Sequence, residues 1–176
     1  MPEQHWSWRA RAVYQGSNMW TKTGRTPLQV FDDVSSSPAS LLAARCAFAA
    51  ALLQGWSGTY RDAVDAYLQV LMHTSNSIVD VVQLPREWWP DSWFTDSART
   101  QCKYKNPALP LTLALPGHPK SGNLWDGHTD ALLVQRGWKK IENWCGVYVH
   151  KDRSILIVYV DDFALIASVQ KAYELS

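Results

Sequence analysis

The chain has 176 residues, of which 47% are hydrophobic and 12% aromatic. This length and composition suit one folded domain, or a portion of a larger one, and exclude a disordered tail. The net charge of +1 excludes a strongly basic overall field, so any nucleic-acid binding must come from local patches. The three cysteines form no Cys-x-x-Cys pair, which indicates neither a disulfide framework nor a zinc site.

The N-terminal residues, Met1 to Trp6, lack the hydrophobic core of a signal peptide. No apolar run in the sequence reaches the length of a membrane span. We therefore expect an intracellular protein in a reducing compartment, with no membrane among its partners.

Residues 6–18 come first among the predicted elements. If this segment is extended, Arg9 and Arg11 share one face because strand side chains alternate with period two. Two guanidinium groups on one face are suited to clamping phosphate, although an ordinary solvated strand face has the same pattern. Residues 16–34 carry Gly, Asn, Thr and Pro and are expected to form a loop.

A helix is predicted next, because Ser37 can act as its cap and Pro38 suits the first helical position. An Ala- and Leu-rich run continues it to Gln54, and Gly55 ends it. Residues 59–69 follow with two aspartates, Asp62 and Asp65, and the aromatic Tyr67. Taken alone, that stretch is typical of the start of an amphipathic helix.

Residues 78–93 are predicted to form a strand that Pro85 ends, followed by an aromatic loop, and residues 94–109 a polar, irregular linker. Residues 111–115 are expected to be a strand that enters a Gly/Pro turn and then a helix to about Arg136. The start of that helix, with Lys120 nearby, has the free backbone donors of an anion site.

The most informative stretch runs from Ile155 to Ala167, where Asp161 and Asp162 separate two apolar runs rich in β-branched residues. This pattern predicts a buried β-hairpin with the two aspartates at its bend. Two carboxylates at the mouth of an apolar hairpin call for a compensating cation, and a divalent metal would supply it. A simple solvated Asp turn is the alternative.

The tetrad from Tyr159 to Asp162 resembles the Tyr-x-Asp-Asp signature of reverse transcriptases, and its flanks resemble the copia-type retrotransposon polymerase. The stretch around Asp62 resembles the first catalytic motif of that family. The resemblance implies that Asp62, Asp161 and Asp162 are the catalytic residues and hold two Mg²⁺ or Mn²⁺ ions. It implies that Tyr67 stacks under the incoming sugar and excludes a 2′-hydroxyl.

The same resemblance implies four further nucleotide-binding residues: Arg9, Arg11, Lys120 and Tyr159. Arg9 and Arg11 stand in the Lys and Arg places of the family's first fingers strand. Lys120 stands in the Gln place of a nucleotide and template motif, in which Gly117 and Trp125 match the family, whereas Pro116 and Asn123 depart from it.

For the whole chain, residues 1–176, the resemblance implies a partial reverse-transcriptase domain. Its expected fold is α+β, the fingers and palm with an antiparallel sheet backed by helices, truncated before the thumb. The implied partners are an RNA or DNA template with its primer, deoxynucleoside triphosphates, and the rest of a Pol polyprotein with thumb, ribonuclease H and integrase. The implied location is a cytoplasmic virus-like particle or the nucleus.

The sequence is compatible with two hypotheses of function. The first is an RNA-directed DNA polymerase that works by two-metal nucleotidyl transfer. The second is an inactive retrotransposon-derived fragment that folds or binds nucleic acid without polymerising. A carboxylate-dependent hydrolase of another kind is a third possibility, but it gives no reason for the Tyr-x-Asp-Asp hairpin.

Overall fold

The computed structural model describes residues 12–21, 23–26, 36, 38–72 and 79–174. Arg9 and Arg11 lie outside these described residues, so the predicted phosphate clamp stays a prediction. None of the helices in the described part of the chain has both the length and the apolar character needed to cross a membrane.

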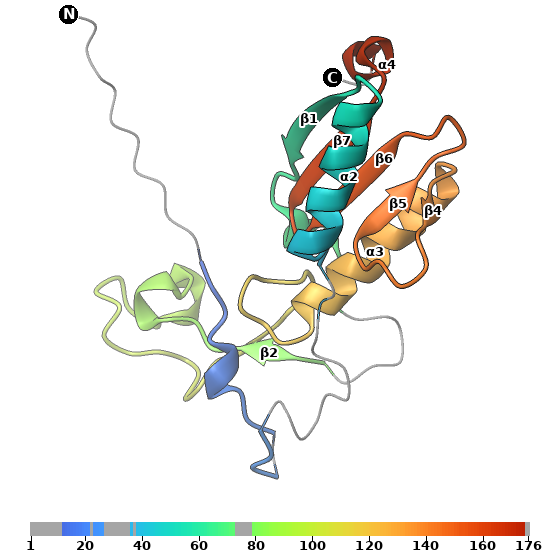
Figure 1. Cartoon of the computed structure of the whole chain (residues 1–176). Helices are drawn as coiled ribbons and strands as arrows, with labels where there is room; N and C mark the ends of the chain where they lie inside the picture. The colour runs from blue at the N-terminus through green and yellow to red at the C-terminus, as the bar shows by residue number, and fades with distance from the viewer. Residues whose placement is uncertain (1–11, 22, 27–35, 37, 73–78, 175–176) are drawn as a thin grey trace, which may run out of the picture.

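The main sheet has five antiparallel strands in the order β1-β7-β6-β5-β4 (Figure 1). Strands β4, β5 and β6 each pair with the next strand along the chain, whereas β1 comes from the first half of the sequence and pairs with β7. A separate two-stranded sheet pairs β2 with β3. The strands are β1 Ser57–Asp62, β2 Val81–Val82, β3 Leu109–Pro110, β4 Lys139–Lys140, β5 Val147–Val149, β6 Ile155–Tyr159 and β7 Asp162–Ala167.

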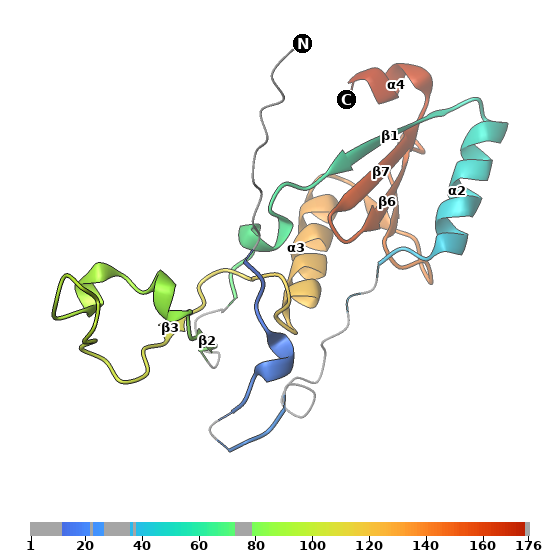
Figure 2. The same cartoon turned by 90° about the vertical axis from the view of Figure 1, so that its left-hand side faces the viewer.

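Helices cover both faces of the main sheet, with α2 on one side and α3 on the other (Figure 2). Because side chains alternate along a strand, one set of strand residues packs on α2 and the other faces α3. The α2 side buries Val147, Ile157 and Ile166, and the α3 side buries Leu156 and Val158. The helices are α2 Leu41–Leu53, α3 Ser121–Gln135 and α4 Val169–Glu174, and the 3-10 turns are η1 Gly16–Asn18, η2 Ala66–Gln69, η3 Arg86–Trp88 and η4 Asp91–Trp93.

The predicted fold class, α+β with an antiparallel sheet packed against helices, is confirmed at that level. The helix expected from Ser37 begins later, because the backbone at Ser40 is still extended and the Ala39 amide before it donates a hydrogen bond to the Val158 carbonyl of β6. Ser40 is the true cap, and its hydroxyl accepts from the Ala43 amide at 3.1 Å. The end at Gln54, followed by Gly55 with a positive φ, is as predicted.

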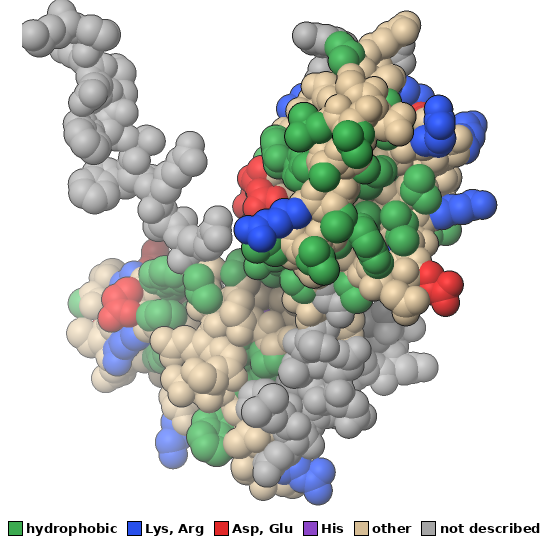
Figure 3. All heavy atoms as spheres, in the orientation of Figure 1, with side chains coloured by type: hydrophobic (Ala, Val, Ile, Leu, Met, Phe, Trp, Pro, Cys, Tyr) green, Lys and Arg blue, Asp and Glu red, His purple; other side chains and the backbone are tan. Residues whose placement is uncertain are grey.

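Apart from one charged residue, Arg45, helix α2 consists of apolar residues, yet only one side is covered. Ala43, Ala47 and Ala51 pack on the sheet, whereas Leu42 and Leu53 are 71% and 88% exposed. Figure 3 shows hydrophobic side chains gathered over this helix. A helix with so few polar residues is ordinarily buried on most sides, so the exposed leucines of α2 are an unusual feature of this fold.

The motif resemblance implied a strand that ends at Asp62, and β1 does pair with β7 as far as Asp62, after which only the short turn η2 follows. The amphipathic helix that the local pattern alone favoured does not form over residues 59–69. Two other elements are shorter than predicted. The strand expected at 111–115 is reduced to a single bridge between Leu113 and Leu71, and the strand before it, β3, covers only Leu109–Pro110. The strand expected from 78 has only Val81 and Val82 among its described residues, although it ends before Pro85 as predicted. Helix α3 reaches Gln135, as expected.

The segment from 85 to 108, called the aromatic lobe below, projects away from the main sheet (Figures 1 and 2). The predicted irregular linker over 94–109 is more ordered than expected. Phe94 is buried and bridges Cys102, and the Thr95 amide donates to the Gln101 carbonyl. The lobe is therefore a small folded unit with its own buried aromatic ring.

Candidate functional site

The β6–β7 hairpin carries the Tyr-x-Asp-Asp tetrad at its turn. Tyr159 ends β6 and pairs directly with Asp162, the first residue of β7, so Val160 and Asp161 form the loop. The predicted bend at Asp161 and Asp162 is thus displaced by one residue. The reason is that a two-residue hairpin fits the strand twist when its first central residue has a positive φ, and Val160 has a φ of 57°.

Val160 is a strained position, because a β-branched side chain rarely adopts a left-handed backbone. The side chain of Trp125, which is only 4% exposed, holds this conformation from below. Its indole Nε1–H donates to the Val160 carbonyl at 2.6 Å. Helix α3 therefore fixes the backbone of the turn that carries both aspartates.

Asp62 reaches the same end of the sheet through the pairing of β1 with β7, in which it stands directly opposite Asp162. The Ala63 amide also donates to the Asp161 carbonyl at 2.8 Å, which ties the end of β1 to the turn. Residues directly opposite each other in an antiparallel pair have their Cβ atoms roughly 5 Å apart on one face. The backbone therefore brings Asp62, Asp161 and Asp162 together, although they are far apart in the sequence.

The three aspartates can be tested against the requirements of a divalent cation. No group of three or more His, Cys, Asp or Glu side chains in the described part of the chain is arranged to hold a metal ion. Mg²⁺ commonly takes only one or two carboxylates and completes its shell with phosphate oxygens and water. The facing pair Asp62 and Asp162 fits that smaller requirement, with Asp161 adjacent in the turn. Like charges directly opposite are destabilising, and a cation between them would relieve this repulsion.

Tyr67 lies in η2, and its ring packs with the buried cluster that contains Ala66 and Trp125. Burial raises the pKa of the Tyr67 phenol, and the nearby charges of Asp161 and Asp126 raise it further. Tyr67 therefore lies near the turn and stays protonated at neutral pH. Asp126 on α3 is a fourth carboxylate of this region that sequence reasoning missed.

Lys120 and Tyr159 differ in their surroundings. Tyr159 is 55% exposed beside Asp162. The Lys120 Nζ lies 3.2 Å from Oδ2 of Asp80, a carboxylate that is 6% exposed, and His118 Nε2 lies 3.7 Å from the same oxygen. Because a buried carboxylate needs a compensating cation, Lys120 serves Asp80, and a nucleotide would have to compete for it.

Two of the supporting residues were visible in the sequence only in part. Trp125 matches the family motif, but the sequence does not predict its hydrogen bond to Val160. Asp80 sits in an apolar run, and a lone acid among strand-forming residues is a signal for a buried partner. Asp126 follows Trp125 directly, yet nothing in the sequence places it near Tyr67.

Comparisons with the models of known protein families, with curated proteins and with solved structures found no match for this chain.

Proposed function

We propose that this chain is the fingers and palm region of an RNA-directed DNA polymerase of the copia-type retrotransposon class. The observation that carries the proposal is the strand register that sets Asp62 opposite Asp162, beside a Tyr-x-Asp-Asp turn. The sequence resemblance named Asp62 and the turn as one catalytic set. Independent of that resemblance, β1 and β7 bring the two motifs to the same end of one sheet.

The chemistry follows from the charge of the proposed site. Nucleotidyl transfer needs the attacking hydroxyl, the α-phosphate and the leaving pyrophosphate to be held in line, and a pair of divalent ions supplies this positioning. Asp62, Asp161 and Asp162 would hold the ions together with phosphate oxygens of the nucleotide. Trp125 would act as a positioning residue, because it holds the turn that presents Asp161.

Primer extension on an RNA template tests the proposal. The intact chain is assayed at low salt with Mg²⁺ or Mn²⁺, beside the double variant Asp161→Asn/Asp162→Asn. With a net charge of +1 the chain should hold a duplex weakly, so we expect little processive synthesis and short products only. Extension that the double variant retains would refute the assigned roles, as would a failure of the intact chain to bind Mn²⁺ in a calorimetric titration.

Sugar selection offers a second, independent test at Tyr67. If its ring leaves room for deoxyribose only, Tyr67→Val should increase the incorporation of ribonucleotides, whereas Tyr67→Phe should keep the wild-type preference. An unchanged preference in Tyr67→Val would remove this role from Tyr67. The comparison uses the same primer and template as the extension assay.

The second candidate is a retrotransposon-derived protein that binds nucleic acid without polymerising. It is favoured by one observation, the ion pair of Lys120 with buried Asp80, which occupies the cation expected to contact the nucleotide. The two candidates differ in metal-dependent extension, since only the first requires it. Binding of an oligonucleotide without extension, in wild type and double variant alike, would decide for the second.

A further inference from the structure

The aromatic lobe carries a pocket of about 540 Å³ that none of the predicted site residues line. Its walls include the rings of Trp93 and Tyr104, which meet edge to face with centroids 5.8 Å apart. Tyr104 is 53% exposed. The lining is Trp93, Lys103, Tyr104, Lys105, Asn106, Pro107 and Ala108.

The charge of the pocket is of one sign. Lys103 and Lys105 line it, and no carboxylate does. The Lys103 Nζ donates to the Ser92 carbonyl at 2.7 Å, which fixes the ammonium at the wall without neutralising it. An aromatic surface beside two fixed or nearby ammonium groups is complementary to a planar, anionic ligand.

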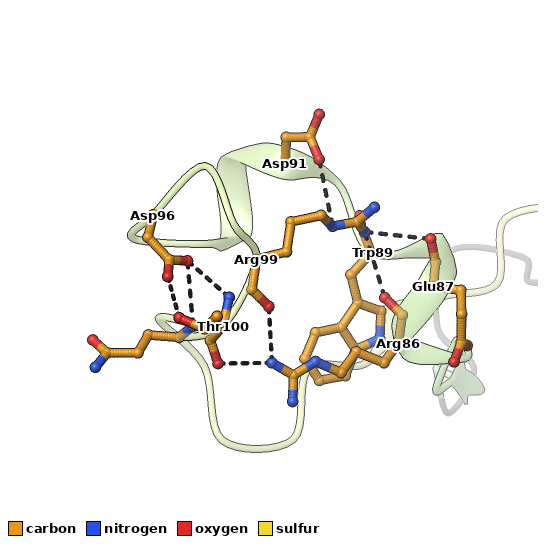
Figure 4. Close-up of polar contacts among 8 residues, drawn as sticks. Arg86, Glu87, Trp89, Asp91, Asp96, Arg99 and Thr100 are labelled. Atoms are coloured by element: carbon orange, nitrogen blue, oxygen red, sulfur yellow. Dashed lines mark hydrogen bonds and ion pairs between the residues drawn. The ribbon is translucent and has the colours of Figure 1, made fainter.

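A clasp of two arginines holds the lobe in shape (Figure 4). Arg86 donates to the carbonyls of Arg99 and Thr100, and Arg99 donates in return to the carbonyl of Trp89 at 2.6 Å. Both guanidinium groups lie over the buried ring of Phe94, at 5.8 and 4.7 Å from its centroid. The clasp therefore ties the first part of the lobe to residues 99 and 100. Within the pocket, the Lys103 amide donates to the Trp93 carbonyl at 2.8 Å, which joins two of the lining residues.

We infer that this pocket binds a base of single-stranded nucleic acid, with its ring against Trp93 and Tyr104 and a neighbouring phosphate at Lys105. Stacking tolerates any base, and lysines add affinity through phosphate neutralisation, so the site would have little sequence preference. Because the pocket lies in the aromatic lobe and contains none of the three aspartates, its binding does not require the proposed polymerase chemistry.

A proline-rich peptide is the other ligand that aromatic walls accommodate. The two lysines and the absence of a lining carboxylate favour a ligand with negative charge, which a proline-rich peptide does not supply. A local positive patch is also compatible with the net charge of +1, because nucleic-acid binding then depends on the patch and not on an overall positive field.

The test measures fluorescence anisotropy of a labelled oligodeoxythymidylate titrated with the full chain at low salt. Tyr104→Ala should weaken binding about 5- to 100-fold, because stacking on one ring is lost. Tyr104→Phe keeps the ring and should bind as the wild type does. Lys105→Gln should lower the affinity and reduce the salt slope by about 0.7, as expected for one phosphate contact on a single strand.

Two controls separate this inference from the polymerase proposal. Trp88→Ala removes an exposed ring of the same lobe outside the pocket and should leave the affinity unchanged. Asp161→Asn/Asp162→Asn should abolish extension and keep oligonucleotide binding. Wild-type affinity in both Tyr104→Ala and Lys105→Gln would overturn the inference, whether or not the chain polymerises. Binding of a polyproline peptide that Tyr104→Ala abolishes, with no oligonucleotide binding, would overturn it in favour of a peptide.

Discussion

The main sheet and the aromatic lobe are stabilised by different interactions. The sheet buries aliphatic side chains between two helices, with Val147 and Ile166 fully inaccessible to solvent. The lobe has few regular elements, and its buried ring, Phe94, is enclosed by two arginines and their hydrogen bonds to backbone carbonyls. The three buried clusters of the described residues take none of their members from 85–108.

Because of this difference, we expect the sheet and the lobe to differ in rigidity. A sheet with a continuous apolar core holds residues in fixed register, which suits the convergence of Asp62 with Asp162. A small unit held by polar contacts at the surface unfolds locally at lower free-energy cost, because it buries little apolar area. Under the two proposals above, the positions of the aspartates would depend on the sheet. Binding of a single-stranded nucleic acid would depend on the lobe.

The largest expected effect is in the core of the sheet. Ile166→Ala removes a fully buried side chain and should lower the free energy of unfolding by about 2–5 kcal/mol, through lost burial and the cavity left behind. Urea unfolding followed by far-ultraviolet circular dichroism measures it. Leu53→Ala on the exposed side of α2 is the control, for which we expect a change within about 0.5 kcal/mol.

The second-largest loss of stability is expected for a substitution that weakens the β6–β7 turn. Trp125→Phe keeps most of the ring but removes the donor to the Val160 carbonyl, at an expected cost of about 1–3 kcal/mol in unfolding free energy. Trp144→Phe, at an exposed position, is the matched control. An equal, small loss in both variants would show that the indole hydrogen bond does not support the turn.

We expect the aromatic lobe to unfold locally while the main sheet stays folded. Phe94→Ala is expected to abolish hydrogen-exchange protection at the Thr95 and Lys103 amides while the global unfolding free energy changes by less than about 1 kcal/mol. The measurement is native-state hydrogen exchange read by mass spectrometry. If Phe94→Ala destabilises the chain as much as Ile166→Ala does, sheet and lobe form one cooperative unit and the comparison is wrong.

The smallest effect concerns a surface ion pair of the sheet region, where Asp152 meets Lys171 of α4 at 2.5 Å and His150 at 3.0 Å. Burial acts to raise the pKa of the Asp152 carboxyl, but hydrogen bonds from Lys171, Ser154 and His150 outweigh it and hold the pKa below its ordinary range.

Because the folded pKa of Asp152 lies below the unfolded value, its stabilisation is present above that unfolded value, about 3.9, and is lost as the pH falls through the folded pKa. Asp152→Asn should therefore cost about 1 kcal/mol at pH 7 and progressively less in acid. Thermal unfolding from pH 7 to pH 2 measures the difference. A constant difference across this range would rule out the carboxylate charge as its cause.

Elements with strong local signals can be predicted from the amino-acid sequence. The hairpin follows from two β-branched runs around a polar turn, and α3 follows from its composition up to Arg136. The end of β1 at Asp62 came from a motif resemblance, since the local pattern favoured a helix. The local pattern predicts a cap at Ser37, whereas α2 begins after Ser40, where the backbone is still extended and the preceding Ala39 amide bonds to Val158 of a distant strand.

Contacts between residues distant in the chain follow from tertiary packing. The register that sets Asp62 opposite Asp162, the indole of Trp125 under Val160, and the pairing of Lys120 with Asp80 all join segments distant in the chain. No local pattern encodes them, because they arise when strands and helices bury their apolar faces together and fix one relative alignment. The sequence thus indicated the chemical groups of the site, and packing against α2 and α3 set their positions.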